Sequence, residues 1–326
     1  MNRYLPLAAT FLLSWALFAS SAAQAQSWPA HPIRWIVPYT AGGTSDFLAR
    51  MIGQKLSERL GQPVVIENKP GAGGNLGTGL VASAAPDGYM MVLGNIGPIA
   101  VSSSLYANLP YDPPRDFEAV TLVAAYPTLL LVNPAFPVKT VKELIDSYRV
   151  QGKSLSYGTP GVGTSQHLTG ELFSSIAGIN TVHVPYKGSA PSLNDAMAGH
   201  IPVIFDTLSS NTIGLVKSGK LRALAITSIA RTPLLPEVPT VSESGLPSFE
   251  VIGWSGVLVP KGTPPSTVKR LEEELTSILQ SPEIKSKIEE AGALVPTLGS
   301  EHFRKFIGTE TSRWKEVVER ASIKPQ

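Results

Sequence analysis

The chain has 326 residues, a formal net charge of +2 and no cysteine. Its basic residues are scattered rather than clustered, which argues against a nucleic-acid-binding surface; without cysteine we expect neither disulfides nor a lipid anchor. Hydrophobic residues make up 43% and charged residues 16% of the chain, a balance typical of a compact protein with buried strands and not of a disordered one.

The first 25 residues have the pattern of a secretory signal peptide. A basic residue, Arg3, precedes an apolar run from Leu5 to Ala19, and small residues lead to Ala23-Gln24-Ala25, which is an A-x-A cleavage site. A membrane anchor is the alternative, but the apolar run falls short of the roughly 20 residues that span a bilayer. We therefore expect cleavage near Ala25 and export of the mature chain.

Beyond these residues, short aliphatic runs alternate with amphipathic helical patterns. The predicted strands are Ile33–Val37, Val64–Glu67, Tyr89–Leu93, Val120–Val123, Leu129–Val132, Leu155–Tyr157, Thr181–Val184, Val203–Phe205, Leu221–Ile226 and Gly256–Val259. The predicted helices are Leu48–Leu60, Val141–Val150, Ser165–Ile176, Ser189–Ala198, Thr267–Gln280, Pro282–Ala291 and His302–Arg320. Alternation of this kind favours an α/β fold with parallel sheets and crossover helices.

Two stretches bounded by proline and glycine, Pro127–Pro137 and Gly253–Pro264, carry a strand pattern but no helix. We interpret them as the two crossings of the chain between two lobes. Lobe I then comprises residues 26–125 plus 256–326 and lobe II residues 126–255, with the helices after Pro264 returning to lobe I. A mature chain of about 300 residues suits two domains of about 150 each.

Loop one, residues 38–46, joins the first strand to the first helix. Gly42 and Gly43 permit a turn with accessible N–H groups, and Thr44 or Ser45 can cap the helix. Because a helix N-terminus presents unpaired donors and a partial positive charge, it suits an anion. Asp46 would repel an anion if it pointed inward, so we expect it to stabilise the first helical turn instead. A plain strand-to-helix turn is the alternative.

Loop two, residues 69–79, follows the strand Val64–Glu67 and invites comparison with nucleotide-binding loops. A G-x-G-x-x-G fingerprint that begins with Gly71 and Gly73 would require glycine where Leu76 stands. No Lys-Ser or Lys-Thr pair follows the glycines, as a phosphate-binding P-loop would require. What remains is a flexible loop with accessible amides before a short helix.

Loop three, residues 157–167, repeats this arrangement, with Thr164 or Ser165 as the helix cap. His167 falls on the first helical turn, where it either contacts a ligand or supports the loop by packing. Ser165 and His167 together suggest a serine hydrolase as an alternative function. However, no G-x-S-x-G elbow surrounds Ser165 and no local acid completes a triad, so we favour binding without turnover.

Further polar residues lie where two other strands end. Lys187 either attracts an anion or is a solvated strand end, and Ser189 is expected to cap the next helix. Asp206 follows the strand Val203–Phe205 at the carboxyl edge, where ligands of α/β sheets bind. It either accepts a hydrogen bond from a ligand or holds a neighbouring loop. The five histidines show no spacing typical of a metal site.

Several segments match, in order, those of a known family and cover nearly all of the mature chain. They are Ile36-Val-Pro-Tyr-Thr-Ala-Gly-Gly-Thr-Ser-Asp46 with Ala49-Arg50, Val65-Ile-Glu-Asn-Lys-Pro-Gly-Ala-Gly-Gly74, Ala85-Pro-Asp-Gly-Tyr89, Tyr157-Gly-Thr-Pro-Gly-Val-Gly-Thr-Ser-Gln-His-Leu168, Val184-Pro-Tyr-Lys-Gly188 and Gly256-Val-Leu-Val-Pro-Lys-Gly-Thr-Pro264. Together these segments resemble the Bug family, the solute receptors of tripartite tricarboxylate transporters.

The resemblance implies a type II periplasmic binding protein fold, in which two α/β lobes close over a ligand cleft. It also implies that one carboxylate of a small organic ligand is held by backbone amides, hydroxyls and bridging waters rather than by an arginine. Tyr39 stands where the family frequently has phenylalanine. From the loops and the resemblance together, the expected ligand-binding residues are Tyr39, Gly42, Gly43, Thr44, Gly73, Gly74, Asn75, Gly163, Thr164, Ser165, His167 and Asp206.

The predicted function is that of a monomeric periplasmic receptor that delivers a carboxylate to the membrane subunits of a transporter. An exported sensor or scaffold using the same pocket is the alternative, since it would differ only at the outer surface. We expect no enzyme activity, no metal or other cofactor and no nucleic-acid partner.

Overall fold

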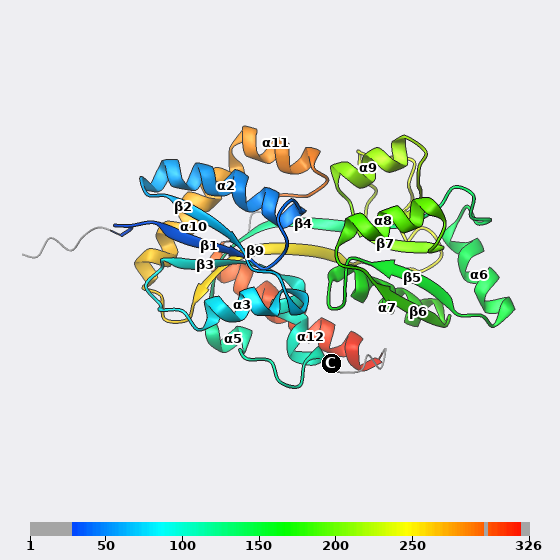
Figure 1. The fold of residues 1–326 in the computed structure, drawn as a ribbon, viewed down its shortest axis with the longest axis horizontal. Helices are drawn as coiled ribbons and strands as arrows, with labels where there is room; N and C mark the ends of the chain where they lie inside the picture. Colours follow the sequence, from blue (N-terminus) through cyan, green and yellow to red (C-terminus); the bar gives the residue numbers. More distant parts are fainter. Residues whose placement is uncertain (1–27, 297–298, 321–326) are drawn as a thin grey trace, which may run out of the picture.

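The computed structural model describes residues 28–296 and 299–320, which form two lobes joined by long strands (Figure 1). The predicted signal peptide, residues 1–25, lies outside these residues. Among the helices of the described part, none is both long enough and apolar enough to cross a bilayer.

Each lobe contains a sheet, and one long strand, β4 (Phe117–Val132), belongs to both. The first sheet has the order β2-β1-β3-β9-β4 and the second continues from β4 through β7 and β5 to β6, with β8 also paired to β4. The other strands are β1 (Ile33–Val37), β2 (Val64–Asn68), β3 (Met90–Asn95), β5 (Leu155–Thr159), β6 (Thr181–Pro185), β7 (Val203–Thr207), β8 (Arg222–Ile226) and β9 (Ile252–Pro260).

The strand directions confirm the predicted α/β class but correct one expectation. The pairs β1–β2, β1–β3, β5–β6 and β5–β7 are parallel, as the alternating pattern predicts. The expectation of wholly parallel sheets is wrong, because β4 and β9 run antiparallel to their neighbours. These two strands carry the chain between the lobes, and no single crossover helix joins either of them to a neighbour in its sheet, so the rule that makes such sequential strands parallel does not apply to them.

Helices cover both faces of the lobe I sheet. On one face, Ile33, Trp35 and Val37 of β1 pack with Leu48 and Leu275 in one apolar cluster, whereas Ile36 points into the other cluster. This alternation follows from the two-residue period of a strand. The helices of this lobe are α2 (Thr44–Leu60), η1 (Ala72–Gly74), α3 (Asn75–Ala82), η2 (Gly97–Val101), α4 (Ser102–Leu105), α5 (Pro113–Asp116), α10 (Pro265–Gln280), α11 (Pro282–Glu290) and α12 (Ser300–Arg320).

Lobe II has the same layered construction. Tyr157 and Phe205 pack with Phe173 on one face of the sheet, and Ile204 packs with Leu193 on the other. Its helices are α6 (Val141–Gln151), α7 (Ser165–Ala177), α8 (Ser189–Ala198) and α9 (Ser210–Lys217). Asp206 follows Phe205 along β7, so its side chain lies on the face that α8 covers.

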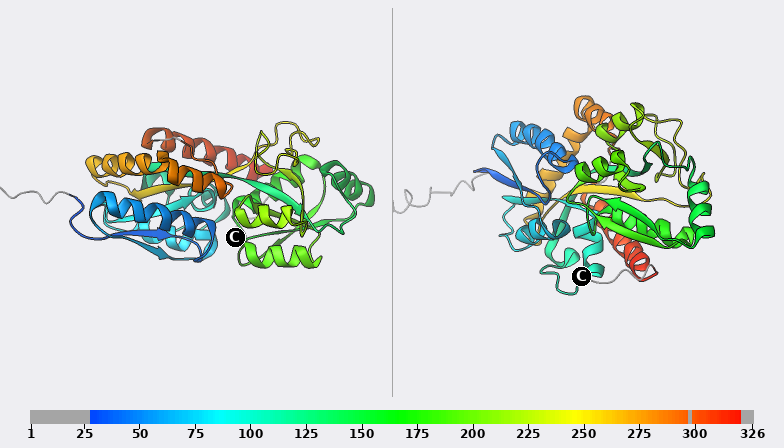
Figure 2. Two further views of the ribbon diagram at one scale, coloured as in Figure 1. Left: turned by 90° about the horizontal axis from the view of Figure 1, so that it is seen from above. Right: turned by 45° about the vertical axis from the view of Figure 1, so that its right-hand side comes forward.

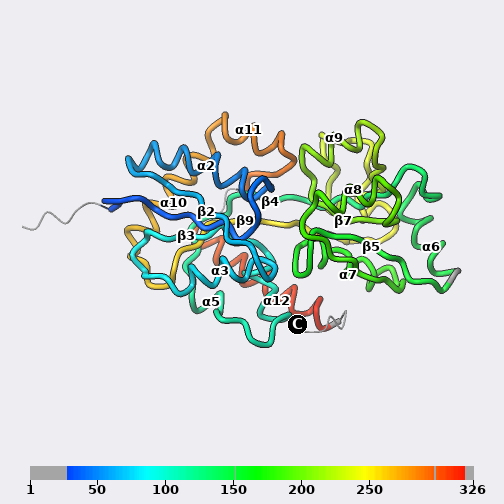
Figure 3. Tube along the Cα trace, viewed as in Figure 1, coloured from blue at the N-terminus to red at the C-terminus, as the bar shows by residue number. Residues whose placement is uncertain are grey.

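Strands β4 and β9 form the connection between the lobes, as the views in Figures 2 and 3 show. Two short strands were predicted at 120–123 and 129–132. In the structure they are parts of one continuous strand, β4, which is buried along nearly all of its length. Residues up to Pro127 pair with β9, and from Thr128 onward the strand pairs with β7 and β8. Pro127, which has no N–H to donate, thus stands where the hydrogen-bonding partner changes.

Candidate functional site

Loops two and three, which lie far apart in the sequence, touch where the lobes meet. A Cβ atom added to Gly73 would lie 3.1 Å from the carbonyl oxygen of Val162, and one added to Gly97 would lie 2.6 Å from that of Gly163. Only glycine permits so close an approach of two backbones. Gly97, which begins η2, was missed by the sequence analysis because its partner is remote in the chain.

The start of α3 offers a side-chain donor. Gly73 and Gly74 have φ angles of +65° and +101°, and they turn loop two into the helix. Asn75 is buried, and its Oδ1 accepts hydrogen bonds from Ser102 Oγ at 2.7 Å and Tyr111 Oη at 2.8 Å. Its Nδ2 has no hydrogen-bond partner among the described residues. The asparagine is therefore held firmly while its amide keeps free donors.

Tyr39 lies against this turn. Its hydroxyl donates a long hydrogen bond, 3.5 Å, to the Gly73 carbonyl, and its ring lies 3.3 Å from where a Gly74 Cβ would be. Burial raises the pKa of Tyr39, and the neighbouring tyrosines Tyr126 and Tyr111 raise it further. The phenol is therefore neutral, and its proton is available to a better acceptor than the Gly73 carbonyl.

Loop one differs from the prediction in its cap. The N-cap of α2 is Gly43, without a side-chain cap, so the expected capping by Thr44 or Ser45 is wrong. Asp46 holds the start of the helix instead, since its Oδ2 accepts from the Gly42 N–H at 2.9 Å and from Arg50 Nε at 3.0 Å. Burial alone would raise the pKa of Asp46, but these bonds lower it. Gly42 and Gly43 are exposed, and the positive φ falls on Gly42, at +82°.

In loop three, Thr164 rather than Ser165 is the cap of α7. Its Oγ1 accepts from the His167 N–H at 3.3 Å and donates to the Gly161 carbonyl at 2.8 Å, so the single hydroxyl proton is used within the loop. Ser165 and Gln166 follow, both buried. Because N–H groups in the first turn have no acceptor within the helix, these two amides are available to a ligand.

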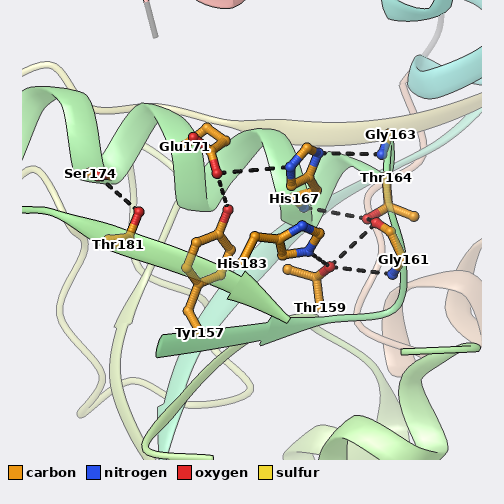
Figure 4. A network of polar contacts seen from close by, with 10 residues as sticks. All are labelled: Tyr157, Thr159, Gly161, Gly163, Thr164, His167, Glu171, Ser174, Thr181 and His183. Atoms are coloured by element: carbon orange, nitrogen blue, oxygen red, sulfur yellow. Dashed lines mark hydrogen bonds and ion pairs between the residues drawn. The ribbon is translucent and has the colours of Figure 1, made fainter. Parts of the chain in front are cut away.

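His167 belongs to a network beneath loop three (Figure 4). Its Nδ1 accepts from the Gly163 N–H at 3.3 Å, and its ring stacks on that of His183 at 4.1 Å. His183 Nε2 lies 2.7 Å from Thr159 Oγ1, and Glu171 accepts from a tyrosine hydroxyl at 2.5 Å. Burial lowers the pKa of His167 to about 4 and that of His183 to about 3. Neutral histidines thus hold the loop in place.

This network predicts that acid weakens the fold. The folded-state pKa of His167 lies below its unfolded value of 6.5. The contribution of this histidine to the free energy of unfolding is therefore fully present above about pH 6.5 and is lost as the pH falls toward 4. We expect His167→Gln to lessen the acid-dependent fall in unfolding free energy by up to ~3 kcal/mol. Urea denaturation between about pH 4 and pH 7 measures this, with exposed His200→Gln as the control. The prediction is contradicted if the free energy of unfolding falls equally with pH in the parent, His167→Gln and His200→Gln.

Asp206 lies at the end of β7 and is 1% exposed. Its Oδ1 accepts from Ser189 Oγ at 2.9 Å and from the Thr207 N–H at 2.7 Å. Ser189 is therefore a partner of Asp206 and not the predicted cap of α8, whose N-cap is Gly188. Burial raises the pKa of Asp206 to about 7. Lys187, in contrast, is exposed.

A buried polar cluster at the crossing strands was not predicted. Asn95 Nδ2 donates to Tyr126 Oη at 3.0 Å and Ser255 Oγ at 2.6 Å, and these two hydroxyls are themselves 2.6 Å apart. Ser165 packs against the neighbouring Gly253, because a Cβ atom at position 253 would lie only 3.0 Å from Ser165 Oγ. Polar residues inside apolar strands were the signal available in the sequence.

The described residues give no support to metal or hydrolase chemistry. They contain no group of three or more histidine and acidic side chains that could hold a metal ion. Ser165 Oγ donates to Gln166 Oε1 at 3.2 Å, while the ring of His167 contacts Gly163 and Glu171. The serine and histidine of the alternative function are therefore not arranged as nucleophile and base in this structure.

Residues 48–323 match the family model described as the tripartite tricarboxylate transporter family receptor. The chain belongs to this family. Protein BugT of Bordetella pertussis is 34% identical over 325 residues, which cover 99% of each chain. The structure of Rpa4515 of R. palustris with adipate shares 37% identity, covers 92% of this chain and all of that one, and has a TM-score of 0.85. The periplasmic binding protein BugD shares 36% identity, with coverage of 92% and 100% and a TM-score of 0.83.

Membership of the transporter receptor family confirms the resemblance to the Bug family and the fold class expected from it. The family's structural relatives are periplasmic solute-binding proteins, and one is described with a carboxylate bound.

Proposed function

We propose that this receptor binds a small organic carboxylate between its lobes and delivers it to the membrane subunits of a tripartite tricarboxylate transporter. One observation carries the proposal: unused hydrogen-bond donors of both lobes lie beside the contact between loops two and three. Asn75 Nδ2 comes from lobe I, and the first-turn amides of Ser165 and Gln166 come from lobe II.

The chemistry of these donors suits a carboxylate. Amides at a helix start gain strength from the helix dipole and from the exclusion of water when two lobes close. No arginine stands within the three loops, so neutral donors would carry the affinity. The proposed ligand-binding set remains the one expected from the sequence, with Gly97 added because it shapes the contact between the loops.

Closure would be a movement of residues 26–125 plus 256–326 against residues 126–255. Opposed donors on two lobes favour the closed state only when a ligand bridges them, which shifts the population of the two states. We propose a monomer in the periplasm that binds without turnover. A sensor that uses the same site is the remaining alternative, and it would differ in its partner rather than in its ligand.

Asn75→Asp tests the site. The substitution keeps the acceptor that Ser102 and Tyr111 use, but it replaces the free amide by a second acceptor with negative charge. A hydrogen bond to a charged group contributes about 1.5–3 kcal/mol, and repulsion adds to its loss. We therefore expect adipate, titrated by calorimetry, to bind at least ~100-fold more weakly.

Asn211→Asp, on the exposed start of α9, is the matched control and should bind like the parent. Thermal melts check that both variants fold, and mass spectrometry of the recovered adipate checks that it is unchanged. Equal affinities of Asn75→Asp and the parent would show that the carboxylate is held elsewhere.

A further inference from the structure

Asp206 is a buried carboxyl group that pairs with no cationic side chain in the described part of the chain. Ser189 Oγ and the Thr207 N–H satisfy its Oδ1, but among the described residues its Oδ2 has no hydrogen-bond partner. The Ser192 hydroxyl also lies close enough to the carboxyl to lower its pKa, but its proton goes to the Ser189 carbonyl at 2.8 Å. An ionised carboxylate in such surroundings is costly, so the group either carries a proton or takes a donor from a ligand.

The position of Asp206 connects it to the proposed site. The parallel register of β7 with β5, continued by two residues, carries Asp206 to the level where β5 gives way to loop three. The next residue, Thr207, accepts a hydrogen bond from Gln166 in the first turn of α7. After it, Leu208 meets lobe I: a Cβ on Gly292 would lie 2.8 Å from its carbonyl oxygen. Asp206 thus stands at the end of β7 that is level with the start of loop three, next to the residue that α7 contacts.

The charged and titratable groups on the surrounding elements are engaged or face elsewhere. On α8, Asp195 accepts from a tyrosine hydroxyl at 2.8 Å, and Lys187 before that helix is exposed. His167 of α7 stacks on His183 of β6, and His183 stacks on Tyr157, which faces the opposite side of the sheet. Opposite this carboxyl, β4 contributes Leu129. Among these groups none is a cation that would hold the carboxyl in its ionised form.

We propose that protonated Asp206 donates a hydrogen bond to the bound carboxylate, so that binding takes up a proton wherever this carboxyl is ionised in the free receptor. The inference rests on the proposed function and specifies the chemistry of its site. Two carboxylates in one desolvated site repel each other, and a single shared proton turns that repulsion into a hydrogen bond. The raised pKa of Asp206, about 7, is in keeping with such a role, because the proton is then held or lost near neutral pH.

Calorimetry with adipate as the probe tests this, at about pH 6 and about pH 8. Only the protonated fraction binds, and that fraction falls from about nine-tenths to about one-tenth, so the apparent Kd should rise about tenfold. Titrations in two buffers of different ionisation enthalpy should show nearly one proton taken up per ligand at the higher pH. Asp206→Asn keeps the shape and an N–H donor but cannot titrate, so its Kd should be flat with pH and lower than the parent's at pH 8.

Exposed Asp146→Asn, the same chemical change elsewhere in lobe II, should behave like the parent. Binding by the parent that is equal at both pH values, without proton uptake, would overturn the role of Asp206 and leave the receptor proposal standing. Tighter binding at pH 8 would also overturn it, since Asp206 would then accept from a ligand donor. If folded parent and Asp206→Asn both fail to bind adipate at either pH, the carboxylate site itself is contradicted. If Asp206→Asn does not fold, the pH dependence of the Kd and the proton uptake of the parent alone test the role of Asp206.

Discussion

Gly97→Val is expected to weaken carboxylate binding by at least ~100-fold while both lobes remain folded. Even the first added atom, a Cβ, would lie 2.6 Å from the Gly163 carbonyl and 3.7 Å from that of Gly73. Overpacking of this kind typically costs about 1–3 kcal/mol, and the clash here is with backbone, which cannot rotate away. Because that backbone belongs to the other lobe, opening the lobes relieves the clash and removes the closed state that binds.

Calorimetry with adipate measures the affinity, and small-angle scattering shows whether the ligand still compacts the protein. Gly97→Ala should fall between the parent and the valine variant. Gly214→Ala is the control, since that helical glycine has nothing within 4 Å of an added Cβ, and it should bind like the parent. Parent-like binding by Gly97→Val would mean that the lobes need not approach at this point. If both Gly97→Val and Gly97→Ala melt at a lower temperature than the parent without ligand, the added atoms clash within lobe I and not between the lobes.

Asp206→Asn is expected to raise the free energy of unfolding above about pH 7 by up to ~4 kcal/mol relative to the parent. The pKa of Asp206 rises from the ordinary 3.8 to about 7 because burial disfavours its charged form. A tenfold change in an acid dissociation constant corresponds to about 1.4 kcal/mol. Asparagine keeps an acceptor for Ser189 and for the Thr207 N–H, so the variant removes the charge without removing these bonds.

The sign follows from proton binding in the two states. Between about pH 4 and pH 7 the unfolded chain has lost the proton that the native chain keeps, so the parent loses stability as the pH rises through this window. The advantage of Asp206→Asn should therefore be small near pH 4, grow up to about pH 7 and then level off. Urea denaturation across this range, with Asp146→Asn as the control, measures it. A constant difference across the range would show that burial does not raise the pKa of this carboxyl.

Local pattern predicted the fold well because most of its elements are strongly patterned. The apolar run Ile33–Val37 predicts a buried strand, and the i+4 spacing of Leu48, Ile52 and Leu56 predicts an amphipathic helix. Among the strands the exception was β4, where Pro127 was interpreted as a boundary, and the short helices η2, α4, α5 and α9 were not predicted. A proline ends a strand only where its missing N–H is needed, and here it stands where the partner strand changes.

The site was only partly predictable. Glycines and caps are local signals, and they indicated loop two, loop three and a cap at Thr164 or Ser165, of which Thr164 is the cap. The roles of Gly97 and of the Asn95–Ser255 pair depend on contacts between segments remote in the chain, which no local pattern encodes. The cap of α2 was mispredicted for a related reason: the carboxylate of Asp46 satisfies the loop, so no hydroxyl is needed.

The continuous strand β4 has a consequence for how the molecule moves. The lobes are connected by a ribbon of two hydrogen-bonded strands, bridged once more between Ala125 and Leu294, and not by flexible linkers. A two-stranded antiparallel ribbon twists readily, but bending it within its own plane would break its ladder of hydrogen bonds. Opening should therefore be a rotation about the ribbon axis. Because the backbone of this ribbon is already hydrogen-bonded, it also offers proteases less free backbone than a loop linker would.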